Sequence, residues 1–377
     1  MKRSAVSWIE SLSPWPAAFG LDRMRALLER LGSPEARLEA VHVVGTNGKS
    51  TTARLVEALL AGAGLRVGTY LSPHVSGWAE RIRIDAREAD FEAVVGRVRA
   101  AADAVGATQF EALTAAALLA FAEARVDVAV VEAGLGGRLD ATNVLAARVV
   151  VLTNVALDHT EVLGETREAI AAEKLAVVRP GATAVLGEPE WEALARSEGA
   201  AAVVVVGRSN LALALAAAES FLGRPVDAKA ADGVALPGRM ERRSDHPLEI
   251  WDGAHNLSGV GWLLARLPVR RYVIVLSILA DKDADGMLAA LSAIAERVVA
   301  TDSGNPRALD PERLADGARQ RGMAAECVPD PDEALRRARE LAGPEGAVLV
   351  TGSLYLLARL SGPAEEKGLA WPSLVSG

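Results

Sequence analysis

The strongest chemical feature of the sequence is a polar turn between an apolar run and a helical stretch, and its members are Gly45, Thr46, Asn47, Gly48, Lys49, Ser50 and Thr51. The two glycines permit a backbone curl whose N–H groups point inward. A helix beginning near Lys49 would add the partial positive charge of its N-terminus to the charge of that lysine. This combination favours binding of nucleotide phosphates, and Ser50 or Thr51 offers the hydroxyl that such loops present to Mg²⁺. Because Val43 replaces the first glycine of the common G-x-x-x-x-G-K-[ST] pattern, an ordinary strand-to-helix turn is the alternative interpretation.

Two further polar positions follow apolar runs that are typical of buried parallel strands. Glu132 follows residues 128–131, and Asp158 and His159 come shortly after residues 149–152. The carboxyl ends of parallel strands meet at one edge of a sheet, where ligands bind. We therefore expect Glu132 near the phosphate loop, where its carboxylate could hold Mg²⁺. A helix cap or an ion pair with Arg138 is the alternative for Glu132, and a structural histidine is the alternative for His159.

Other candidate residues are less distinctive when they are judged from residue type and position alone. Lys174 lies on a predicted helix over residues 165–178, where a solvent-exposed charge is the simplest interpretation. Asp252, His255 and Asn256 follow a predicted strand in the C-terminal part of the chain. These groups would suit contacts with a nucleotide or a transferred phosphoryl group across a cleft between domains, and a simple turn is the alternative.

Composition narrows the class of protein. The 377 residues are 50% hydrophobic and 24% charged, which is typical of a globular protein with buried sheets. The formal net charge of −8 argues against nucleic acid or an anionic membrane as the main partner. The single cysteine, Cys327, excludes an intramolecular disulfide, and no apolar run approaches the length of about 18 residues that a membrane span needs. These features predict a cytoplasmic protein, with a monomer as the default.

The order of predicted elements indicates two α/β domains. Strands alternate with helices from about residue 40 to residue 222, which predicts a doubly wound parallel sheet of the P-loop ATPase type. Residues 223–238 are rich in Pro, Gly, Asp and Ala and suggest an interdomain connection. The C-terminal part alternates again, with candidate strands at residues 248–251, 272–276, 298–300, 325–328 and 347–350. We therefore predict an ATP-binding domain over residues 1–233 and a smaller Rossmann-like domain over residues 234–377.

Taken together, these stretches resemble the folylpolyglutamate synthase/dihydrofolate synthase family of the Mur-ligase superfamily. The N-terminal matches are residues 45–49, 72–74, 80–82, 110–114, 132–143, 157–160 and 173–174. The C-terminal matches are residues 237–239, 252–256, 281–283 and 351–355. The resemblance covers nearly the whole chain in the expected order. It implies an ATP-dependent amide ligase that adds L-glutamate to dihydropteroate or to a folate through an acyl phosphate.

The resemblance also implies residue roles. The implied ATP contacts are the phosphate-loop residues 45–51 together with Arg239, Asp252 and Asn256. The implied catalytic residues are Lys49, Lys174, Asp252 and His255, with Lys174 matching a family lysine that is found as a carbamate. Two Mg²⁺ ions are implied, and their candidate ligands are Ser50, Thr51, Ser72, Glu132 and His159. The implied contacts with the acid substrate or glutamate are Ser72, Pro73, His74, Arg81, Phe110, Asp140, Ala141 and Ser353. Arg83 is a further candidate on the pteroate side, where surface loop charges are the alternative for His74, Arg81 and Arg83.

Two departures from the family pattern leave questions open. Ser50 stands where this family often has Gly, so either Ser50 or Thr51 could ligate the metal. The chain is also short for the family, so a loop that grips the folate could be trimmed. The stretch from Arg138 to Ala141 resembles the bacterial branch that also accepts dihydropteroate, which favours a bifunctional enzyme. The alternatives are another Mur-type ligase, acting on a cell-wall nucleotide peptide or a polyamide, and a nucleotide-binding regulatory protein.

Overall fold

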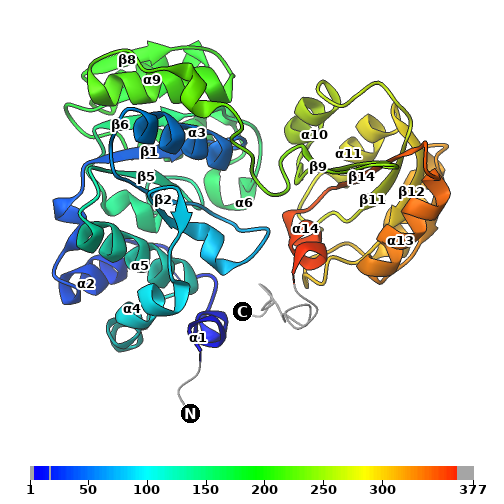
Figure 1. The fold of residues 1–377 in the computed structure, drawn as a ribbon, viewed down its shortest axis with the longest axis horizontal. Helices are drawn as coiled ribbons and strands as arrows, with labels where there is room; N and C mark the ends of the chain where they lie inside the picture. The colour runs from blue at the N-terminus through cyan, green and yellow to red at the C-terminus, as the bar shows by residue number, and fades with distance from the viewer. Residues whose placement is uncertain (1–3, 17, 363–377) are drawn as a thin grey trace. The chain divides into compact units, whose positions relative to one another are not determined.

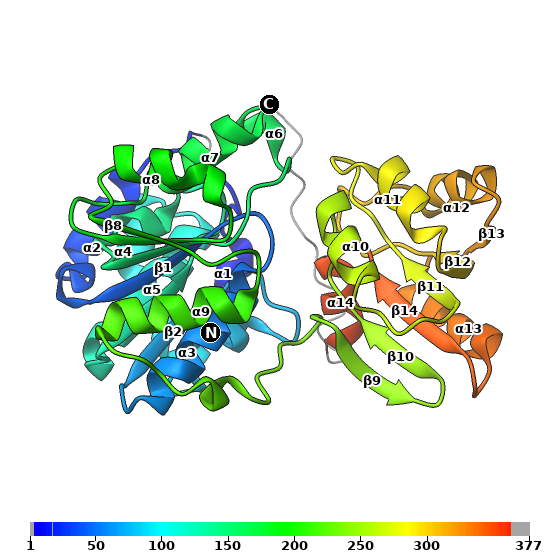
Figure 2. The ribbon, with the colours of Figure 1, turned by 90° about the horizontal axis from the view of Figure 1, so that it is seen from above.

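The computed structural model of the chain describes residues 4–16 and 18–362, and these form two compact units. The first unit contains the described residues up to His74 and those from Trp78 to Val234. The second contains the described residues from Ala235 onward together with the short segment Val75–Gly77. Val75 packs in the second unit's core beside Trp251 and Leu354. Figure 1 and Figure 2 show the two units, which are described separately below.

The first unit is built on an eight-stranded sheet with the order β4-β3-β2-β5-β1-β6-β7-β8. Its strands are β1 (Ala40–Val44), β2 (Val67–Tyr70), β3 (Ile82–Ile84), β4 (Arg87–Glu88), β5 (Val128–Glu132), β6 (Val149–Leu152), β7 (Thr183–Leu186) and β8 (Ala202–Val205). The six strands from β2 to β8 in that order pair in parallel, as predicted. β3 and β4 add an antiparallel hairpin at one edge. The sequence pattern did not predict this hairpin, because strands of two or three residues carry almost no periodicity.

Helices cover both faces of this sheet (Figure 2). They are α1 (Ala5–Ser11), α2 (Asp22–Arg30), α3 (Lys49–Gly62), α4 (Phe91–Val105), α5 (Gln109–Ala124), α6 (Thr160–Leu163), α7 (Arg167–Leu175), α8 (Glu192–Ser197) and α9 (Asn210–Leu222). α3 and α9 pack on the face that presents Val41 and Val43, whereas α4, α5 and α7 pack on the face that presents Val44. Alternate residues of a strand point to opposite faces, so a central parallel strand must be apolar on both. β1 and β5 are accordingly buried along their whole length.

Local capping chemistry sets several helix ends. Asp90 caps α4 through its side chain, which accepts a hydrogen bond from Ala93 N at 3.1 Å. α5 begins at Gln109, because Thr108 and Glu111 form a reciprocal capping box at its start. α7 is shorter than the predicted range of 165–178 because Thr166 caps it at its start. These caps fix the residue at which each helix begins.

The second unit is a six-stranded sheet with the order β13-β12-β11-β14-β10-β9. Its strands are β9 (Glu241–Asp245), β10 (Leu248–Trp251), β11 (Tyr272–Leu276), β12 (Ala295–Ala300), β13 (Ala324–Cys327) and β14 (Ala347–Thr351). The five strands from β10 to β14 pair in parallel and match the predicted strands. β9 is an antiparallel edge strand that the sequence pattern did not indicate, because its residues are almost all polar.

Among the described residues, the helices that cover the second sheet are α10 (Leu257–Leu264), α11 (Ala284–Leu291), α12 (Pro311–Gln320), α13 (Pro331–Ala342) and α14 (Leu354–Ser361). α10, α11 and α12 contribute to one core cluster, and α13 and α14 contribute to the cluster on the other face. Among residues 4–16 and 18–362, none of the helices combines the length and the apolar character that a bilayer crossing requires. Both units are therefore sheets covered by helices on two sides, with loops gathered at the carboxyl ends of the parallel strands.

Candidate active site

The phosphate loop adopts the curled backbone that its glycines predicted. Gly45 has φ +147° and Gly48 has φ +80°, and Gly48 caps the N-terminus of α3. A Cβ atom at Gly45 would lie 1.8 Å from Thr153 Oγ1, so only glycine fits at that position. Lys49 Nζ donates to the carbonyl of Thr46 at 3.3 Å, which turns the lysine back over the loop. The loop therefore has the shape and charge of an anion cradle.

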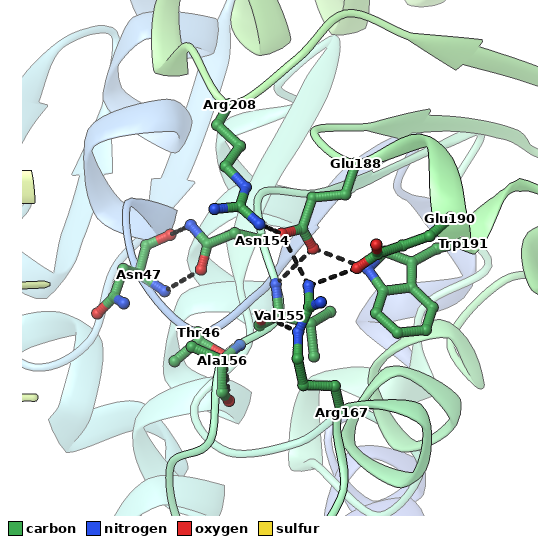
Figure 3. Close-up of polar contacts among 10 residues, drawn as sticks. All are labelled: Thr46, Asn47, Asn154, Val155, Ala156, Arg167, Glu188, Glu190, Trp191 and Arg208. Atoms are coloured by element: carbon green, nitrogen blue, oxygen red, sulfur yellow. Dashed lines mark hydrogen bonds and ion pairs between the residues drawn. The ribbon is translucent and has the colours of Figure 1, made fainter. Parts of the chain in front are cut away.

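A second segment, residues 153–156 directly after β6, holds the phosphate loop in place (Figure 3). The side-chain amide of Asn154 pairs with the backbone of Asn47, accepting from its N–H at 3.1 Å and donating to its carbonyl at 2.9 Å. Thr153 Oγ1 also donates to that carbonyl, at 2.7 Å. Thr46 N donates to the Asn154 carbonyl at 2.9 Å. No role was predicted for Asn154, although it is a polar residue after a buried strand, the same feature that indicated Glu132.

Glu132, Ser50 and Ser72 meet at this edge of the sheet. Ser50 Oγ donates to Glu132 Oε1 at 3.0 Å, and Ser72 N donates to Glu132 Oε2 at 3.0 Å. All three residues are buried. The contact places Glu132 beside the phosphate loop, as expected, and not in the alternative ion pair with Arg138. Arg138 instead pairs with Glu173 at 2.9 Å.

The geometry of Ser50 and Glu132 suits a magnesium ion. Mg²⁺ takes oxygen ligands in an octahedron at about 2.0–2.1 Å, so neighbouring ligand oxygens lie about 2.9 Å apart. Ser50 Oγ and Glu132 Oε1 are separated by 3.0 Å. Within the described part of the chain, no group of three or more His, Cys, Asp or Glu side chains is arranged to hold a metal.

His159 occupies the same edge of the sheet, after β6, which is the neighbour of β1. It caps the short helix α6 and has φ +51°, a left-handed conformation that is uncommon for a histidine. Its Nε2 lies 3.9 Å from Asp158 Oδ1, and about a third of its side chain is exposed. Glu132, the phosphate loop and His159 thus follow the adjacent strands β5, β1 and β6.

The interpretation of Lys174 as a solvent-exposed charge is wrong. The side chain is buried, and its Nζ donates to the carbonyl of Gly45 at 3.0 Å. Burial, together with the positive charge of Lys49, lowers the pKa of Lys174 to about 7. The carboxylates of Asp158 and Asp140 oppose this shift. Helical position alone could not reveal this, because the contact spans 129 residues of sequence.

The loop after β2 brings His74, Trp78 and Arg81 together. Arg81 Nε donates to His74 Nδ1 at 2.9 Å, and its guanidinium lies 5.0 Å from the centre of the Trp78 ring. The rings of His74 and Trp78 are 4.4 Å apart. Burial, assisted by the charge of Arg81, lowers the pKa of His74 well below its usual value, so the imidazole is neutral. Pro73, which precedes His74, follows a cis peptide bond with Ser72.

Three other predicted substrate residues lie on the same side of the sheet. Phe110 is half-buried, with its ring 6.0 Å from that of Tyr70, and a Cβ at Gly134 would come within 2.5 Å of Phe110 Cζ. Asp140 is buried and accepts hydrogen bonds from the backbone of Leu135 at 2.7 Å and from Thr142. Burial raises the pKa of Asp140.

Asp140 caps the short 3-10 turn that begins at Ala141, and Ala141 is buried. Arg83 is bound by Glu57 of α3, with Nε 3.3 Å from Oε1. The structure thus gives Arg83 a carboxylate partner within the fold.

In the second unit, the predicted nucleotide contacts gather after β10. Asp252 is buried and accepts hydrogen bonds from Met240 N at 2.8 Å and Ala254 N at 2.9 Å. Burial raises the pKa of Asp252, while the charge of Arg239 opposes that shift. His255 Nδ1 lies 2.8 Å from the Gly253 carbonyl, and Asn256 caps α10.

Ser353 lies two residues after the neighbouring strand β14 and caps α14, with its Oγ accepting from Tyr355 N at 3.1 Å. All of these groups lie at the carboxyl edge of the second sheet, because β10 and β14 pair in parallel.

Two residues at this edge were missed by the sequence analysis. Ser277 follows β11 and Ser303 follows β12, and both hydroxyls are buried without a hydrogen-bond partner in the described structure. The side chain of Lys282 is also buried, with Nζ 3.2 Å from Asp281 Oδ2. Buried polar groups are normally paired, so an unpaired hydroxyl at a strand end suggests that a ligand completes it. The available signal for Ser277 was its place directly after a buried apolar run, whereas Ser303 follows the polar residues Thr301 and Asp302.

Comparisons with known proteins agree with this geometry. Residues 43–222 match the Mur ligase middle domain, and residues 238–354 match the Mur ligase glutamate ligase domain. The dihydrofolate synthase/folylpolyglutamate synthase of Mycobacterium tuberculosis is 36% identical, over 80% of this chain and 78% of that protein. The Escherichia coli protein of the same name is 33% identical, over 95% of this chain and 94% of that protein.

Solved structures of proteins with these names are also similar to this chain. The E. coli FolC structure in complex with DHPP and ADP has a TM-score of 0.86 and 31% identity, covering 95% of this chain and 97% of that chain. The Yersinia pestis bifunctional folylpolyglutamate synthase/dihydrofolate synthase with Mn, AMPPNP and L-glutamate bound has a TM-score of 0.85 and 32% identity, with the same coverage. The two-domain α/β fold and the family resemblance predicted from the sequence are thereby confirmed. The chain belongs to the dihydrofolate synthase/folylpolyglutamate synthase family of Mur ligases.

Proposed function

We propose that this protein is an ATP-dependent ligase that joins the amino group of L-glutamate to the carboxyl group of dihydropteroate or a reduced folate. The observation that carries this proposal is the convergence of the phosphate loop, the Ser50–Glu132 pair and buried Lys174 at one sheet edge. The names and bound ligands of the relatives supply the substrate class. The proposed ATP-binding domain comprises residues 1–233, and the proposed ligase domain comprises residues 234–377.

The proposed reaction has two steps. The substrate carboxylate attacks the γ-phosphorus of ATP, which forms an acyl phosphate and releases ADP. The amine of glutamate then attacks the acyl carbon, inorganic phosphate leaves, and an amide remains after loss of a proton. Phosphoryl transfer depends mainly on positioning and charge neutralisation. Residues 45–51 would bind the β- and γ-phosphates through Lys49 and the N-terminus of α3, while the amides of Thr46 and Asn47 donate to Asn154 and hold the loop in shape.

Magnesium is the proposed metal. Ser50 and Glu132 fit it by the spacing of their oxygens, and Thr51, Ser72 and His159 are the other proposed ligands, shared between two ions. A divalent ion bound here would neutralise phosphate charge. Ser72 N fixes the second oxygen of Glu132, which orients the carboxylate towards Ser50. The contribution of the chain itself to the proposed metal site is this orientation of the Glu132 carboxylate.

Lys174 is proposed to carry a carbamate. Formation of a carbamate requires a neutral amine, which combines with carbon dioxide and loses one proton. The pKa of about 7 makes the neutral amine accessible near neutral pH, whereas an ordinary lysine would be almost fully protonated. The modification would replace one of two neighbouring cations by an anion, which would relieve the repulsion between Lys174 and Lys49. It would also give Lys49 an anionic neighbour that helps to orient it.

The pterin-bearing acid is proposed to bind beside the loop after β2. Ser72, Pro73 and His74 form the start of this loop, and Arg81 offers a cation that is already oriented by His74. Phe110 supplies an aromatic face next to Gly134, where the absent side chain leaves room for the ring. Asp140 and Ala141 complete the proposed contacts through the turn that Asp140 fixes.

The second domain is proposed to contribute to both ATP and glutamate binding. The proposed nucleotide contacts are Arg239, which precedes β9, and Asp252, His255 and Asn256, which follow β10. Ser353 is the proposed glutamate contact, and the unpaired hydroxyls of Ser277 and Ser303 extend it along the same strand ends. The buried ammonium of Lys282 would attract a carboxylate of glutamate. We further propose a cytoplasmic monomer with no nucleic-acid or membrane partner, which accords with the net charge of −8 and the single cysteine.

The test is phosphate release measured with purified protein, ATP and Mg²⁺. We expect release only when both L-glutamate and dihydropteroate or a reduced folate are present, with a product heavier by one glutamyl residue. Comparing dihydropteroate with tetrahydrofolate decides whether one or both additions occur. Lys49→Ala provides the inactive control. Release with ATP alone, or none with any pteroate, contradicts the proposed substrate class.

A further inference from the structure

Glu188 is the buried centre of a polar cluster that contacts the segment holding the phosphate loop (Figure 3). Its side chain is buried, and each of its carboxylate oxygens receives two donors. Oε2 accepts from Val155 N at 2.9 Å and from Trp191 Nε1 at 2.7 Å. Oε1 accepts from Arg167 Nη2 at 3.0 Å and forms an ion pair with Arg208. Neither the sequence motifs nor the proposed reaction gives this residue a role.

The first connection from Glu188 reaches Asn47 of the phosphate loop. Arg167 Nε donates to the carbonyl of Val155 at 3.0 Å, while Val155 N donates to Glu188. The backbone of Val155 is therefore held on both sides by the Glu188–Arg167 pair. Asn154 directly precedes Val155. The side-chain amide of Asn154 accepts a hydrogen bond from the N–H of Asn47 and donates one to its carbonyl. The position of Asn47 thus depends on Glu188 through two short links.

The second connection reaches Gly48. Arg208 pairs with Glu188 and is followed by Ser209, which caps α9. The next residue, Asn210, lies against the phosphate loop, because a Cβ added at Gly48 would come within 2.6 Å of Asn210 Oδ1. The start of α9 therefore contacts the loop at Gly48, in addition to the contact that Asn154 makes with Asn47.

We propose that Glu188 is a positioning residue for nucleotide binding. Together with Arg167 and Arg208 it holds two segments, one carrying Asn154 and one carrying Asn210, against the phosphate loop. This inference rests on the proposed function of that loop. It predicts that Glu188 sets the affinity for ATP and ADP and leaves the affinity for glutamate unchanged, because its contacts lead to Asn47 and Gly48.

A carboxylate is needed at this position on chemical grounds. A glutamine has one accepting oxygen and one donating NH₂ group, so in either orientation its NH₂ faces two donors. It also removes the negative charge shared by Arg167 and Arg208, which leaves Arg167 paired with Glu190 alone. A buried donor without an acceptor is unfavourable. Glu188→Gln should therefore release at least one of the two segments while changing the shape of the side chain very little.

A role of Glu188 in stability alone predicts a different pattern of nucleotide affinities. The variant Trp191→Phe distinguishes that role from a role in positioning the phosphate loop. This variant removes one donor from the same carboxylate but leaves Val155, Arg167 and Arg208 in place. Glu190→Gln is a second control, because it removes only the other, half-exposed partner of Arg167. If the cluster serves stability alone, nucleotide affinity should not distinguish Glu188→Gln from these controls.

The experiment is calorimetric titration with ADP, which requires no catalytic turnover. We expect Glu188→Gln and Arg208→Ala to raise the ADP dissociation constant at least tenfold, which corresponds to about 1.4 kcal/mol. Trp191→Phe and Glu190→Gln should remain within about twofold of the wild type, a change of about 0.4 kcal/mol or less. Hydrogen exchange should show lost protection of the amides of Thr46 and Asn47 in Glu188→Gln only. In steady-state assays, KM for ATP should rise while KM for glutamate stays constant.

The possible results distinguish failure of the Glu188 inference from failure of the proposed nucleotide site. Wild-type affinity in a destabilised Glu188→Gln protein would make Glu188 a structural residue only and overturn the inference. Failure of the wild type to bind ADP would overturn the proposed nucleotide site itself, and the inference with it. If Glu188→Gln does not fold, Arg208→Lys replaces it, since the Arg208 side chain is largely exposed. Arg208→Lys should weaken ADP binding less than Arg208→Ala, and equal affinities in those two variants and the wild type would contradict the second connection.

Discussion

Lys174 Nζ donates a 3.0 Å hydrogen bond to the carbonyl of Gly45, which joins α7 to the phosphate loop. The lysine is buried beside a second cation, Lys49, and these two conditions lower its pKa to about 7. The phosphate loop is therefore in contact with an amine that can change its charge near neutral pH. This is a property of the packing, because the local sequence around Lys174 is that of an ordinary surface helix.

The first prediction concerns stability as a function of pH. The pKa of Lys174 in the folded protein lies below the ordinary value of 10.5, so between about pH 7 and pH 10.5 the unfolded chain binds more protons. Stability should therefore rise with pH through that window. Lys174→Met removes this titration, so its stability relative to the wild type should be greatest below pH 7 and fall by up to roughly 4 kcal/mol towards pH 10.

The measurement is urea unfolding at several pH values in buffer free of carbon dioxide. Lys229→Met, at an exposed position, provides the control, since its stability relative to the wild type should not change with pH. With ¹³C-labelled bicarbonate, a carbamate NMR signal should appear in the wild type and be missing in Lys174→Met. A parallel pH dependence of the wild type and Lys174→Met would mean that Lys174 does not titrate in this range.

The second prediction concerns the metal site. Glu132→Gln should lower turnover by about 100-fold or more while leaving the fold intact, because it removes the charged oxygen beside Ser50. Ser50→Ala should raise the Mg²⁺ concentration needed for half-maximal activity by about tenfold. Thr51→Ala should change it much less, since Ser50 makes the contact with Glu132. Turnover assays across a Mg²⁺ titration give all three values, and the opposite order for Ser50 and Thr51 would identify Thr51 as the ligand.

The third prediction compares two glycines with positive φ. Gly45→Ala would place a Cβ 1.8 Å from Thr153 Oγ1, so it should displace the segment after β6 and abolish detectable nucleotide binding. Gly64 has φ +94° but has open space around the position of its Cβ. Gly64→Ala should therefore lose about 1 kcal/mol of stability from backbone strain and keep normal turnover. Chemical denaturation and ADP titration of both variants check this, and normal ADP affinity in Gly45→Ala would show that the loop tolerates the displacement.

The fourth prediction concerns acid sensitivity. His42 lies within β1, with Nε2 2.8 Å from Thr142 Oγ1 and Nδ1 without a partner in the described structure. Burial, followed by the charge of Arg179, lowers its pKa from 6.5 to about 3. Because the unfolded chain takes up the proton first, stability should be lost as the pH falls from about 6.5 towards 3. At pH 5 this loss should be about 2 kcal/mol.

His42→Leu should abolish that part of the pH dependence, whatever its effect on stability at pH 8. Urea unfolding at pH 8, 6 and 5 measures it. His246→Gln is the matched control, because His246 is exposed in the second unit and should leave the wild-type dependence unchanged. An identical acid dependence in His42→Leu and the wild type would contradict the assignment.

The fifth prediction concerns glutamate. Ser277→Ala and Ser303→Ala each remove a buried hydroxyl that has no partner in the described structure, so neither should destabilise the free protein. Each should nevertheless raise KM for glutamate by roughly fivefold, the effect of one hydrogen bond of about 1 kcal/mol. Ser292→Ala, which removes an exposed hydroxyl bonded to Ala289, is the control. An unchanged KM for glutamate in both variants would remove these serines from the proposed site.

The sequence by itself determined the main frame of the protein. Apolar runs of four or five residues located β1, β5, β6 and most strands of the second sheet, because a central parallel strand must be buried on both faces. The phosphate loop was recognisable because its glycines, lysine and hydroxyls are adjacent in the chain. Glu132 was found by the same local logic, as the first polar residue after a buried run.

Only the tertiary structure decided which of the remaining charges are structural and which lie at the phosphate loop. Lys174 is buried at Gly45, Asp140 caps a turn, Arg83 is bound by Glu57, and Glu188 joins two segments that touch the loop. Short polar edge strands such as β3, β4 and β9 were also decided there. The physical reason is that burial, and with it the pKa and partner of a charged group, depends on residues distant in sequence. A local pattern of residue types carries no information about them.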